Sequence, residues 1–292
     1  TLKAARQERQ PALVYHGGLE RDQRFQLSLL SALRTAMSDN QLQLYLQPKA
    51  DSRTGRVTGA EVLLRWQHPE HGLVSPRDFL PFAEKSGMIV ELTRWMMVQA
   101  MQLARHWQLR GLDLKLSLNL SASDLADPNL PAHVSEYLMH SRANAQQLVL
   151  EITESEIMHD PQLAVRSMQA LRKLGFQLAL DDFGTGHATL AYLQDMPVSD
   201  LKIDRSFVVN ASQNEKGLRL IESIVALAHT MGLRTVVEGV ETEADWHRVV
   251  DAGCDEVQGY YLSPPLPIAG FEAWLALNQP FAIPQAQTSL AL

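Results

Sequence analysis

The chain of 292 residues contains one cysteine, Cys254, so it cannot form an internal disulfide bond. Such cysteine usage is typical of a reducing compartment, and we expect a cytoplasmic location. The longest apolar runs, such as residues 224–228, are far too short to span a bilayer, and no signal peptide is visible, so we expect no membrane contact by this segment. The chain begins with Thr1 rather than Met, so we expect a fragment of a longer protein, whose missing part would carry any membrane anchor or sensor.

The chain also lacks an excess of positive charge. It has 26 Lys and Arg against 33 Asp and Glu, a net charge of −7. This balance argues against a broad basic surface for a nucleic-acid polymer, but it allows a small anionic ligand held by local cations and metal ions. None of the ten histidines lies in a His-Glu-x-x-His pattern, which disfavours a zinc hydrolase.

The most informative segment is Asp181-Asp182-Phe183-Gly184-Thr185-Gly186, which follows an apolar run at 176–180 that is typical of a buried strand. Burying two unpaired carboxylates costs several kcal/mol, on the order quoted for polar burial. A divalent cation would remove that cost, and one carboxylate can bridge two metals. Two solvated aspartates in a turn are the alternative interpretation.

Two other motifs share letters with this segment. An Asp-Phe-Gly triplet also occurs in kinases, but no Gly-rich phosphate loop, Val-Ala-Ile-Lys or His-Arg-Asp element accompanies it here. Gly184 and Gly186 lack the third glycine of a dinucleotide-binding fingerprint. We therefore set both classes aside.

Strand-like and helical segments alternate along the chain. The expected strands are 42–47, 60–66, 114–120, 148–153, 178–181, 201–204, 235–238 and 256–258. The expected helices are 25–37, 79–110 with a break near Ser86-Gly87, 130–140, 161–174, one from Ala188, 215–231, 243–252 and 268–277. This alternation implies a parallel sheet, and so many units over about 250 residues favour a closed (β/α)8 barrel, with a doubly wound open sheet as the alternative.

In such a barrel the catalytic groups lie at the carboxyl ends of the strands. Polar groups close or closely follow most of the expected strands: Gln47, Asn119, Glu151 with Glu154, Asp181 with Asp182, Glu238 with Glu241, and Gln258. Two further strands carry polar pairs, Glu61 with Arg65 on one face of the second strand, and Lys202 with Asp204. Each one alone fits a cap or a loop contact, but the joint pattern predicts a site at one rim.

Carboxylates and one asparagine make an all-oxygen ligand set, which selects Mg²⁺ or Mn²⁺ over Zn²⁺. Two metals that share an aspartate suit the hydrolysis of a phosphodiester. Arg65 is suited to clamp a phosphate, and Lys202 to position the attacking water or to stabilise developing charge.

These segments resemble the EAL-domain family of cyclic di-GMP phosphodiesterases. The Glu-Ala-Leu signature occurs here as Glu61-Val62-Leu63, followed by Leu64-Arg65. The other matching segments are Leu118-Asn119-Leu120-Ser121, Leu150-Glu151-Ile152-Thr153-Glu154, Asp181 to Gly186, Leu201-Lys202-Ile203-Asp204, Val237-Glu238-Gly239-Val240-Glu241-Thr242 and Gln258-Gly259-Tyr260. The match runs from about residue 25 to residue 277, and its ordered motif set is highly specific.

The resemblance implies a modified TIM (β/α)8 barrel at 25–279, in which the first strand runs antiparallel to the others. It implies hydrolysis of cyclic di-GMP to linear pGpG with two Mg²⁺ or Mn²⁺ ions, in the bacterial cytoplasm or in the cytoplasmic part of a membrane-anchored protein. Residues 1–24 would be a linker or the tail of a preceding GGDEF-like domain, and 280–292 a disordered tail. A homodimer through the loop after Asp182 and its adjacent helices is also expected.

The resemblance also implies a role for each motif residue. The first metal would be held by Glu61, Asn119, Glu151 and Asp181, and the second by Asp181, Asp182 and Glu238. Lys202 would contact the catalytic water, Glu238 would aid its deprotonation, and Glu154 would brace the loop after Asp182. Substrate contact or support of the site would fall to Gln47, Leu63, Arg65, Asp182, Arg205, Glu241 and Gln258. Asp204 is open between a site role and a structural role at the end of its strand.

Two positions depart from the family pattern. Val62 replaces Ala in the signature, with a modest expected effect because its side chain points away from Glu61. Pro264 stands where many members carry Lys or Arg, which would loosen substrate contacts at the rim. No metal or general-base position is substituted, so an active enzyme is favoured. The alternatives are a weak or inactive cyclic di-GMP sensor that signals through a partner domain, and an unrelated barrel hydrolase argued from fold alone.

Overall fold

The computed structural model describes residues 32–184, 190–278 and 280–281. The chain divides into two compact units, one of residues 1–43 and 65–88 and one of residues 44–64 and 89–292. Several expectations lie outside the described residues: the linker at 1–24, the start of the helix at 25–37, the onset of a helix at Ala188, and the tail from residue 282.

The smaller unit is a short helical and hairpin structure. Residues 32–38 are helical, the end of β2 (Val57–His68) pairs antiparallel with β3 (Gly72–Val74), and α3 (Pro76–Ser86) follows. The indole of Trp66 is buried edge-on against Phe79, at 5.4 Å between ring centroids. The helix α3 ends at Gly87, whose φ of 77° is favourable for glycine. The break expected near Ser86-Gly87 is therefore present.

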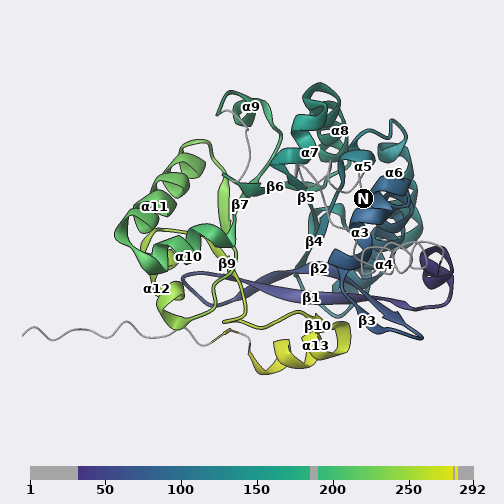
Figure 1. Ribbon diagram of the computed structural model, residues 1–292, viewed down its shortest axis with the longest axis horizontal. Coiled ribbons are helices and arrows are strands. Elements are labelled where there is room, and N and C mark those ends of the chain that lie inside the picture. The colour runs from purple at the N-terminus through teal and green to yellow at the C-terminus, as the bar shows by residue number, and fades with distance from the viewer. Residues whose placement is uncertain (1–31, 185–189, 279, 282–292) are drawn as a thin grey trace, which may run out of the picture. The chain divides into compact units, whose positions relative to one another are not determined.

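The larger unit contains a closed barrel of eight strands (Figure 1). In order around the barrel these are β1 (Leu42–Asp51), β2, β4 (Lys115–Asn119), β5 (Leu148–Thr153), β6 (Gln177–Phe183), β7 (Asp200–Ile203), β8 (Arg234–Val237) and β9 (Glu256–Gln258). The strands from β2 to β9 pair in parallel, whereas β1 is antiparallel to β9. The predicted barrel with an antiparallel first strand is thus confirmed. The two-residue β10 (Leu266–Pro267) adds to the other edge of β1.

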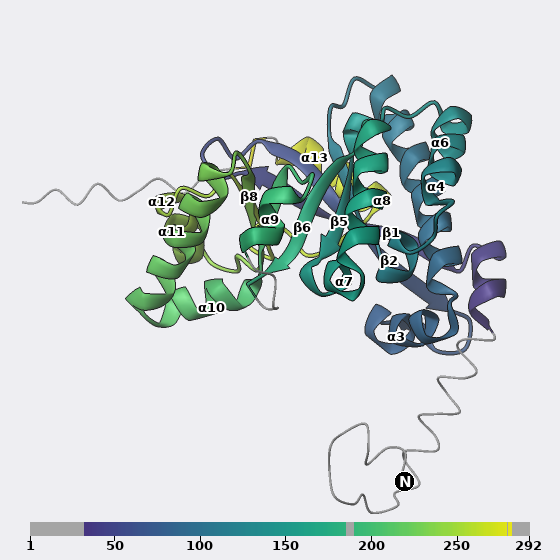
Figure 2. The same cartoon turned by 90° about the horizontal axis from the view of Figure 1, so that it is seen from above.

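Helices alternate with these strands. They are α4 (Ile89–Leu109), α5 (Ala122–Leu125), α6 (Leu130–Ser141), α7 (Glu154–His159), α8 (Pro161–Lys173), α9 (Leu190–Asp195), α10 (Arg205–Gln213), α11 (Glu215–Thr230), α12 (Glu243–Asp251) and α13 (Ile268–Leu277). Figures 1 and 2 both show α4 beside α6, and α10 beside α11. The apolar side chains of α4 recur every three or four positions and are buried, which is why this segment forms an amphipathic helix. No helix among the described residues is long and apolar enough to cross a membrane.

One expectation about a strand end is wrong. Gln47 does not close the first strand, because β1 continues through Lys49 to Asp51 and forms a ladder with β9. Phe281, at the start of the expected tail, has a backbone N–H that donates to the Gly55 carbonyl at 2.8 Å, and its ring lies 5.9 Å from that of Trp246. The disorder expected for the tail stays a prediction.

Candidate functional site

The end of β6 is distorted at the two adjacent aspartates. In a regular strand Asp181 and Asp182 would point to opposite faces of the sheet. The pairing of β6 with β7 shifts register between Leu180 and Phe183, and Asp182 adopts a left-handed conformation with φ of 54°. This bulge brings oxygens of both carboxylates to one place, a common use of bulges beside functional sites.

A third carboxylate, that of Glu238 just after β8, joins this pair. One oxygen from each of Asp181, Asp182 and Glu238 lies within 4.8 Å of the others. An octahedral cation with bonds of about 2.1 Å holds oxygens roughly 3 to 4 Å apart, so these three lie near the spacing that Mg²⁺ or Mn²⁺ needs. The all-oxygen donor set and its geometry fit such an ion.

The electrostatics of this cluster also favour a cation. Burial, together with the charges of Asp181 and Glu61, raises the pKa of Glu238 to about 8, although Lys202 opposes the shift. Burial likewise raises the pKa of Asp181, and burial with Asp204 raises that of Asp182. Raised pKa values of this kind mean that the positive charge present does not offset burial and the neighbouring carboxylates, and a bound divalent ion would add to it.

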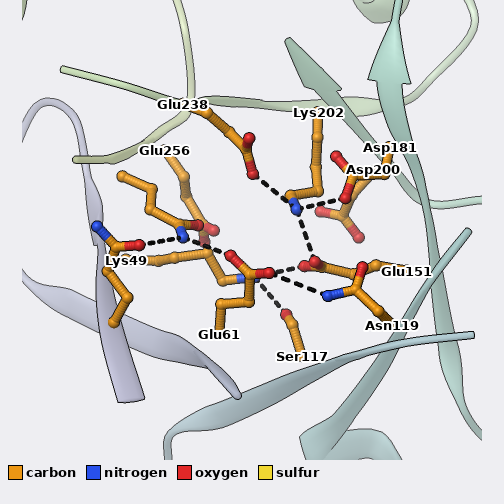
Figure 3. Close-up of polar contacts among 12 residues, drawn as sticks. Lys49, Glu61, Ser117, Asn119, Glu151, Asp181, Asp200, Lys202, Glu238 and Glu256 are labelled. Atoms are coloured by element: carbon orange, nitrogen blue, oxygen red, sulfur yellow. Dashed lines mark hydrogen bonds and ion pairs between the residues drawn. The ribbon is translucent and has the colours of Figure 1, made fainter. Parts of the chain in front are cut away.

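Lys202 on β7 provides the positive charge that the cluster does contain. Its Nζ donates to Glu151 Oε2 at 2.6 Å and to Asp181 Oδ2 at 2.8 Å, and lies 2.7 Å from Glu238 Oε1 (Figure 3). Burial alone would lower the pKa of Lys202, but the carboxylates around it raise the pKa well above its usual value. Glu151 is fully buried; burial raises its pKa, but Lys202 and Lys49 outweigh this and bring it to about 2.

Glu61 on β2 is held by amides rather than by ammonium groups. Asn119 Nδ2 donates to Glu61 Oε1 at 3.0 Å, and Gln258 Nε2 donates to Glu61 Oε2 at 2.6 Å. Gln258 Nε2 also donates to Gln47 Oε1 at 3.2 Å, and Gln47 Nε2 donates to the Ser263 carbonyl at 3.4 Å. Asn119, predicted for metal binding, and Gln47 and Gln258, predicted for substrate contact or support of the site, thus form one chain that orients the Glu61 carboxylate.

A cleft of about 180 Å³ opens beside this chain. Its lining includes the predicted residues Gln47, Glu61, Leu63, Arg205, Glu238, Glu241 and Gln258. At its exposed side Arg205 and Glu241 form an ion pair at 3.4 Å, a contact that the sequence did not predict. Such an exposed pair is weak and can be displaced by a ligand.

Glu154 and Asp204 both act on backbone near the cluster. Glu154 is buried, and its Oε2 accepts from the N–H of Gly184, two residues beyond Asp182, at 3.4 Å. Asp204 caps α10 by accepting from the N–H of Ser206 at 3.0 Å, which supports the structural alternative for this residue. It also raises the pKa of Asp182, so it contributes to the field of the cluster.

The predicted site residues that belong to the larger unit lie together in the structure. Two residues need separate mention, Arg65 and Lys49. Arg65 belongs to the smaller unit, so its phosphate contact stays a prediction. Lys49, which the sequence reading passed over, donates to Glu151 Oε1 at 3.1 Å and makes a short hydrogen bond to Ser117. The signal was available: Lys49 follows Gln47 by two positions and therefore shares its face of the strand.

Comparison with known proteins agrees with this geometry. The EAL domain family matches residues 30–265. The bifunctional diguanylate cyclase/cyclic di-GMP phosphodiesterase MucR of Pseudomonas aeruginosa is 40% identical over 243 residues, and the cyclic di-GMP phosphodiesterase PdeR of Escherichia coli is 35% identical over 242. Each alignment covers 83% of this chain and 36% of the relative, so this chain spans little more than a third of their length.

A solved structure described as the PaMucR phosphodiesterase in complex with c-di-GMP is also similar. It is 39% identical in sequence and superposes with a TM-score of 0.80, over 84% of this chain and 99% of that one. The two proteins are thus similar in both fold and sequence. The chain therefore belongs to the EAL domain family.

Proposed function

We propose that this domain hydrolyses cyclic di-GMP to linear pGpG. The observation that carries the proposal is the cluster of Asp181, Asp182 and Glu238 around the Lys202 ammonium, at the carboxyl ends of neighbouring barrel strands. This is where barrel enzymes place their chemistry. The relatives named above, including one described in complex with c-di-GMP, support cyclic di-GMP as the substrate.

The reaction needs two Mg²⁺ or Mn²⁺ ions. Glu61, Asn119, Glu151 and Asp181 are proposed to hold one, and Asp181, Asp182 and Glu238 the other. When bound, the ions lower the pKa of water and neutralise charge on the phosphate oxygens. All six side chains offer an oxygen ligand, and Glu61, Glu151 and Asp181 are buried, which supports the assignment.

The chain's own residues align and deprotonate the water. The three carboxylate partners of Lys202 account for its three N–H groups, so to orient a water beside Asp181 its ammonium would exchange one of them, the contact with Glu238, for that water. Glu238, with its pKa raised to about 8 in the metal-free protein, is the residue suited to accept that water's proton. The water oxygen bonds to phosphorus, one P–O3′ bond breaks, and the departing O3′ takes up a proton.

The rim of the cleft would bind the rest of the substrate. Arg205 and Arg65 are the cations proposed to meet phosphate or guanine, and Glu241 is the partner that Arg205 leaves on binding. Leu63, Gln47 and Gln258 line or support the cleft and complete the proposed substrate site. The catalytic domain is proposed to extend over 25–279.

Dimerisation stays a prediction. The loop after Asp182 that was expected to form the interface includes residues 185–189, which lie outside the described residues. The GGDEF-like tail at 1–24 lies there too.

The deciding experiment is anion-exchange analysis of cyclic di-GMP incubated with this protein, with Mn²⁺, with Mg²⁺ and with EDTA. We expect pGpG only with metal, and we expect Glu61→Gln and Asp181→Asn to abolish it while the fold is kept. Metal-independent product, or equal product from Asp181→Asn, would contradict the proposal. Binding of intact cyclic di-GMP without turnover would instead support the sensor alternative.

A further inference from the structure

Lys49 lies inside the barrel and is not among the residues assigned to the site so far. It is 4% exposed, and its ammonium group is shared between β4 and β5 through Ser117 and Glu151. Lys49 lies two residues after Gln47 on β1, and it pairs with Gln258 in the antiparallel ladder between β1 and β9. Figure 3 shows its side chain approaching Glu151 from a different direction than that of Lys202.

The two lysines divide the Glu151 carboxylate between them. Oε1 accepts from Lys49 at 3.1 Å, and Oε2 accepts from Lys202 at 2.6 Å. The two carboxylate oxygens have about four acceptor positions in all, and Ser117 is a further hydrogen-bond partner, so an acceptor position remains for a further ligand. Two fixed donors on a fully buried carboxylate leave its plane little freedom to rotate.

Lys49 is charged in spite of its burial. Burial alone would lower its pKa, but Glu151, with smaller contributions from Glu256 and Glu61, raises it above the usual value. A buried ammonium of this kind costs several kcal/mol to desolvate unless its partners are well placed. Removing Lys49 alone would also cost stability, because the buried Glu151 carboxylate would lose one of its two cations, so a role in stability and a role in positioning have to be separated by experiment.

We propose that Lys49 is a positioning residue that, with Ser117, orients the Glu151 carboxylate for metal binding. The inference rests on the proposed function, because it takes Glu151 as a metal ligand. Groups that orient ligands from behind commonly change metal affinity or activity by about 10-fold to 100-fold when removed.

A purely electrostatic role of Lys49 predicts the opposite change in metal affinity. Removing Lys49 takes a positive charge away from a site that attracts a cation, and by Coulomb's law this alone would tighten metal binding. A role in orienting Glu151 predicts weaker binding in spite of the more negative site. A role in stability alone predicts a lower melting temperature with unchanged affinity in the folded protein.

The test is calorimetric titration of Mn²⁺ into wild type, Lys49→Met and Lys49→Arg, without substrate, beside melting curves in EDTA. Lys115→Met is the matched control, because it removes a partly exposed lysine from β4 while the two donors to Glu151 remain. We expect Lys49→Met to bind Mn²⁺ at least 10-fold more weakly, Lys49→Arg within about threefold of wild type, and Lys115→Met unchanged or slightly tighter. Ser117→Ala should fall between wild type and Lys49→Met.

Unchanged or tighter Mn²⁺ binding by folded Lys49→Met would overturn the inference, as would an absence of Mn²⁺ binding by wild type. If Lys49→Met does not fold, Lys49→Gln takes its place, because its shorter, uncharged side chain cannot hold the same contact. Turnover of cyclic di-GMP is measured separately. A wild type that binds Mn²⁺ but forms no pGpG would refute the proposed function, while the Mn²⁺ affinities would still decide the role of Lys49.

Discussion

At the scale of single residues, Glu238 shows most clearly how the fold sets chemistry. It is a carboxyl with one ion-pair partner, Lys202 at 2.7 Å, in a place where burial, Asp181 and Glu61 disfavour its charged form. Its pKa of about 8 in the metal-free protein, against an ordinary value of 4.5, means that the folded chain binds a proton there that the unfolded chain has lost. Folding and protonation are therefore linked.

This linkage gives a pH dependence with a definite sign. Between about pH 4.5 and pH 8 the native state binds more protons than the unfolded state, so the free energy of unfolding should fall as pH rises. Glu238→Gln imitates the protonated form and should lose this part of the slope. Urea unfolding in EDTA at several pH values across this window measures it. Parallel pH profiles for wild type and Glu238→Gln would contradict the assignment.

The sequence predicted the acidic residues of the site because carboxylates at successive strand ends are visible without a structure. It did not predict how they are held. Lys49 was missed because the first strand was taken to end at Gln47, whereas β1 continues to Asp51. Lys49 lies inside the barrel, where polar side chains can also be buried. The bulge at Asp182, with φ of 54°, was equally hidden, since aspartate tolerates that conformation without glycine.

At the scale of elements, the connection after β8 is the most tightly constrained part of the site. Gly239 has φ of 73°, and a Cβ there would lie 2.3 Å from the Cβ of Arg205 and 3.1 Å from its Cα. Arg205 is the first residue of α10, so the start of this helix sits directly against the segment that carries Glu238. Only glycine fits without moving one of the two.

Substitution by alanine should separate conformation from contact. Gly239→Ala should cost more than about 2 kcal/mol of stability, because a left-handed conformation costs about 1 kcal/mol and the clash with Arg205 adds to it. Gly232→Ala is the matched control, with φ of 72° and nothing within 4 Å of the added Cβ. Gly232→Ala should lose only the stability that the left-handed conformation costs. Denaturant midpoints compare the two, and equal losses would show that the contact with Arg205 is unimportant.

The long helices followed from the sequence, and the shortest helices did not. The helices at 161–174 and 215–231 were predicted almost to the residue, because apolar periodicity over many positions is a strong signal. The helices α5 and α7 have four and six residues, too few to show a period. Their capping boxes, at Ser121 and Thr153, were the available local signal.

At the scale of the whole molecule, the carboxylates form a cluster only in the folded chain. Glu61, Glu151, Asp181 and Glu238 come from β2, β5, β6 and the segment after β8, and the unfolded chain has no equivalent site. A ligand that binds only the native state stabilises it by about 2.7 kcal/mol at a concentration 100-fold above its dissociation constant. Metal should therefore act as a stabiliser as well as a reactant.

The corresponding measurement is the melting temperature with and without Mn²⁺. At saturating metal we expect a rise of roughly 5 to 10 °C, from the usual 2 to 4 °C per kcal/mol for chains of this size. Excess EDTA should reverse the rise, and Asp181→Asn should show little of it because Asp181 is shared by both proposed ions. A wild-type melting temperature that does not respond to Mn²⁺ would show that the cluster does not bind the metal.

The hydrogen bond from Gln258 to Glu61 joins residues 197 positions apart, and β9 closes the barrel against β1. During synthesis, the amino-terminal half of the site must therefore wait for almost the entire domain to be made. A chain released from the ribosome before Gln258 lacks both the closing strand and one of the two amides that hold Glu61. Incomplete chains would thus contain the signature residues but not the assembled site, so the proposed activity would arise only once the closing strand has been made.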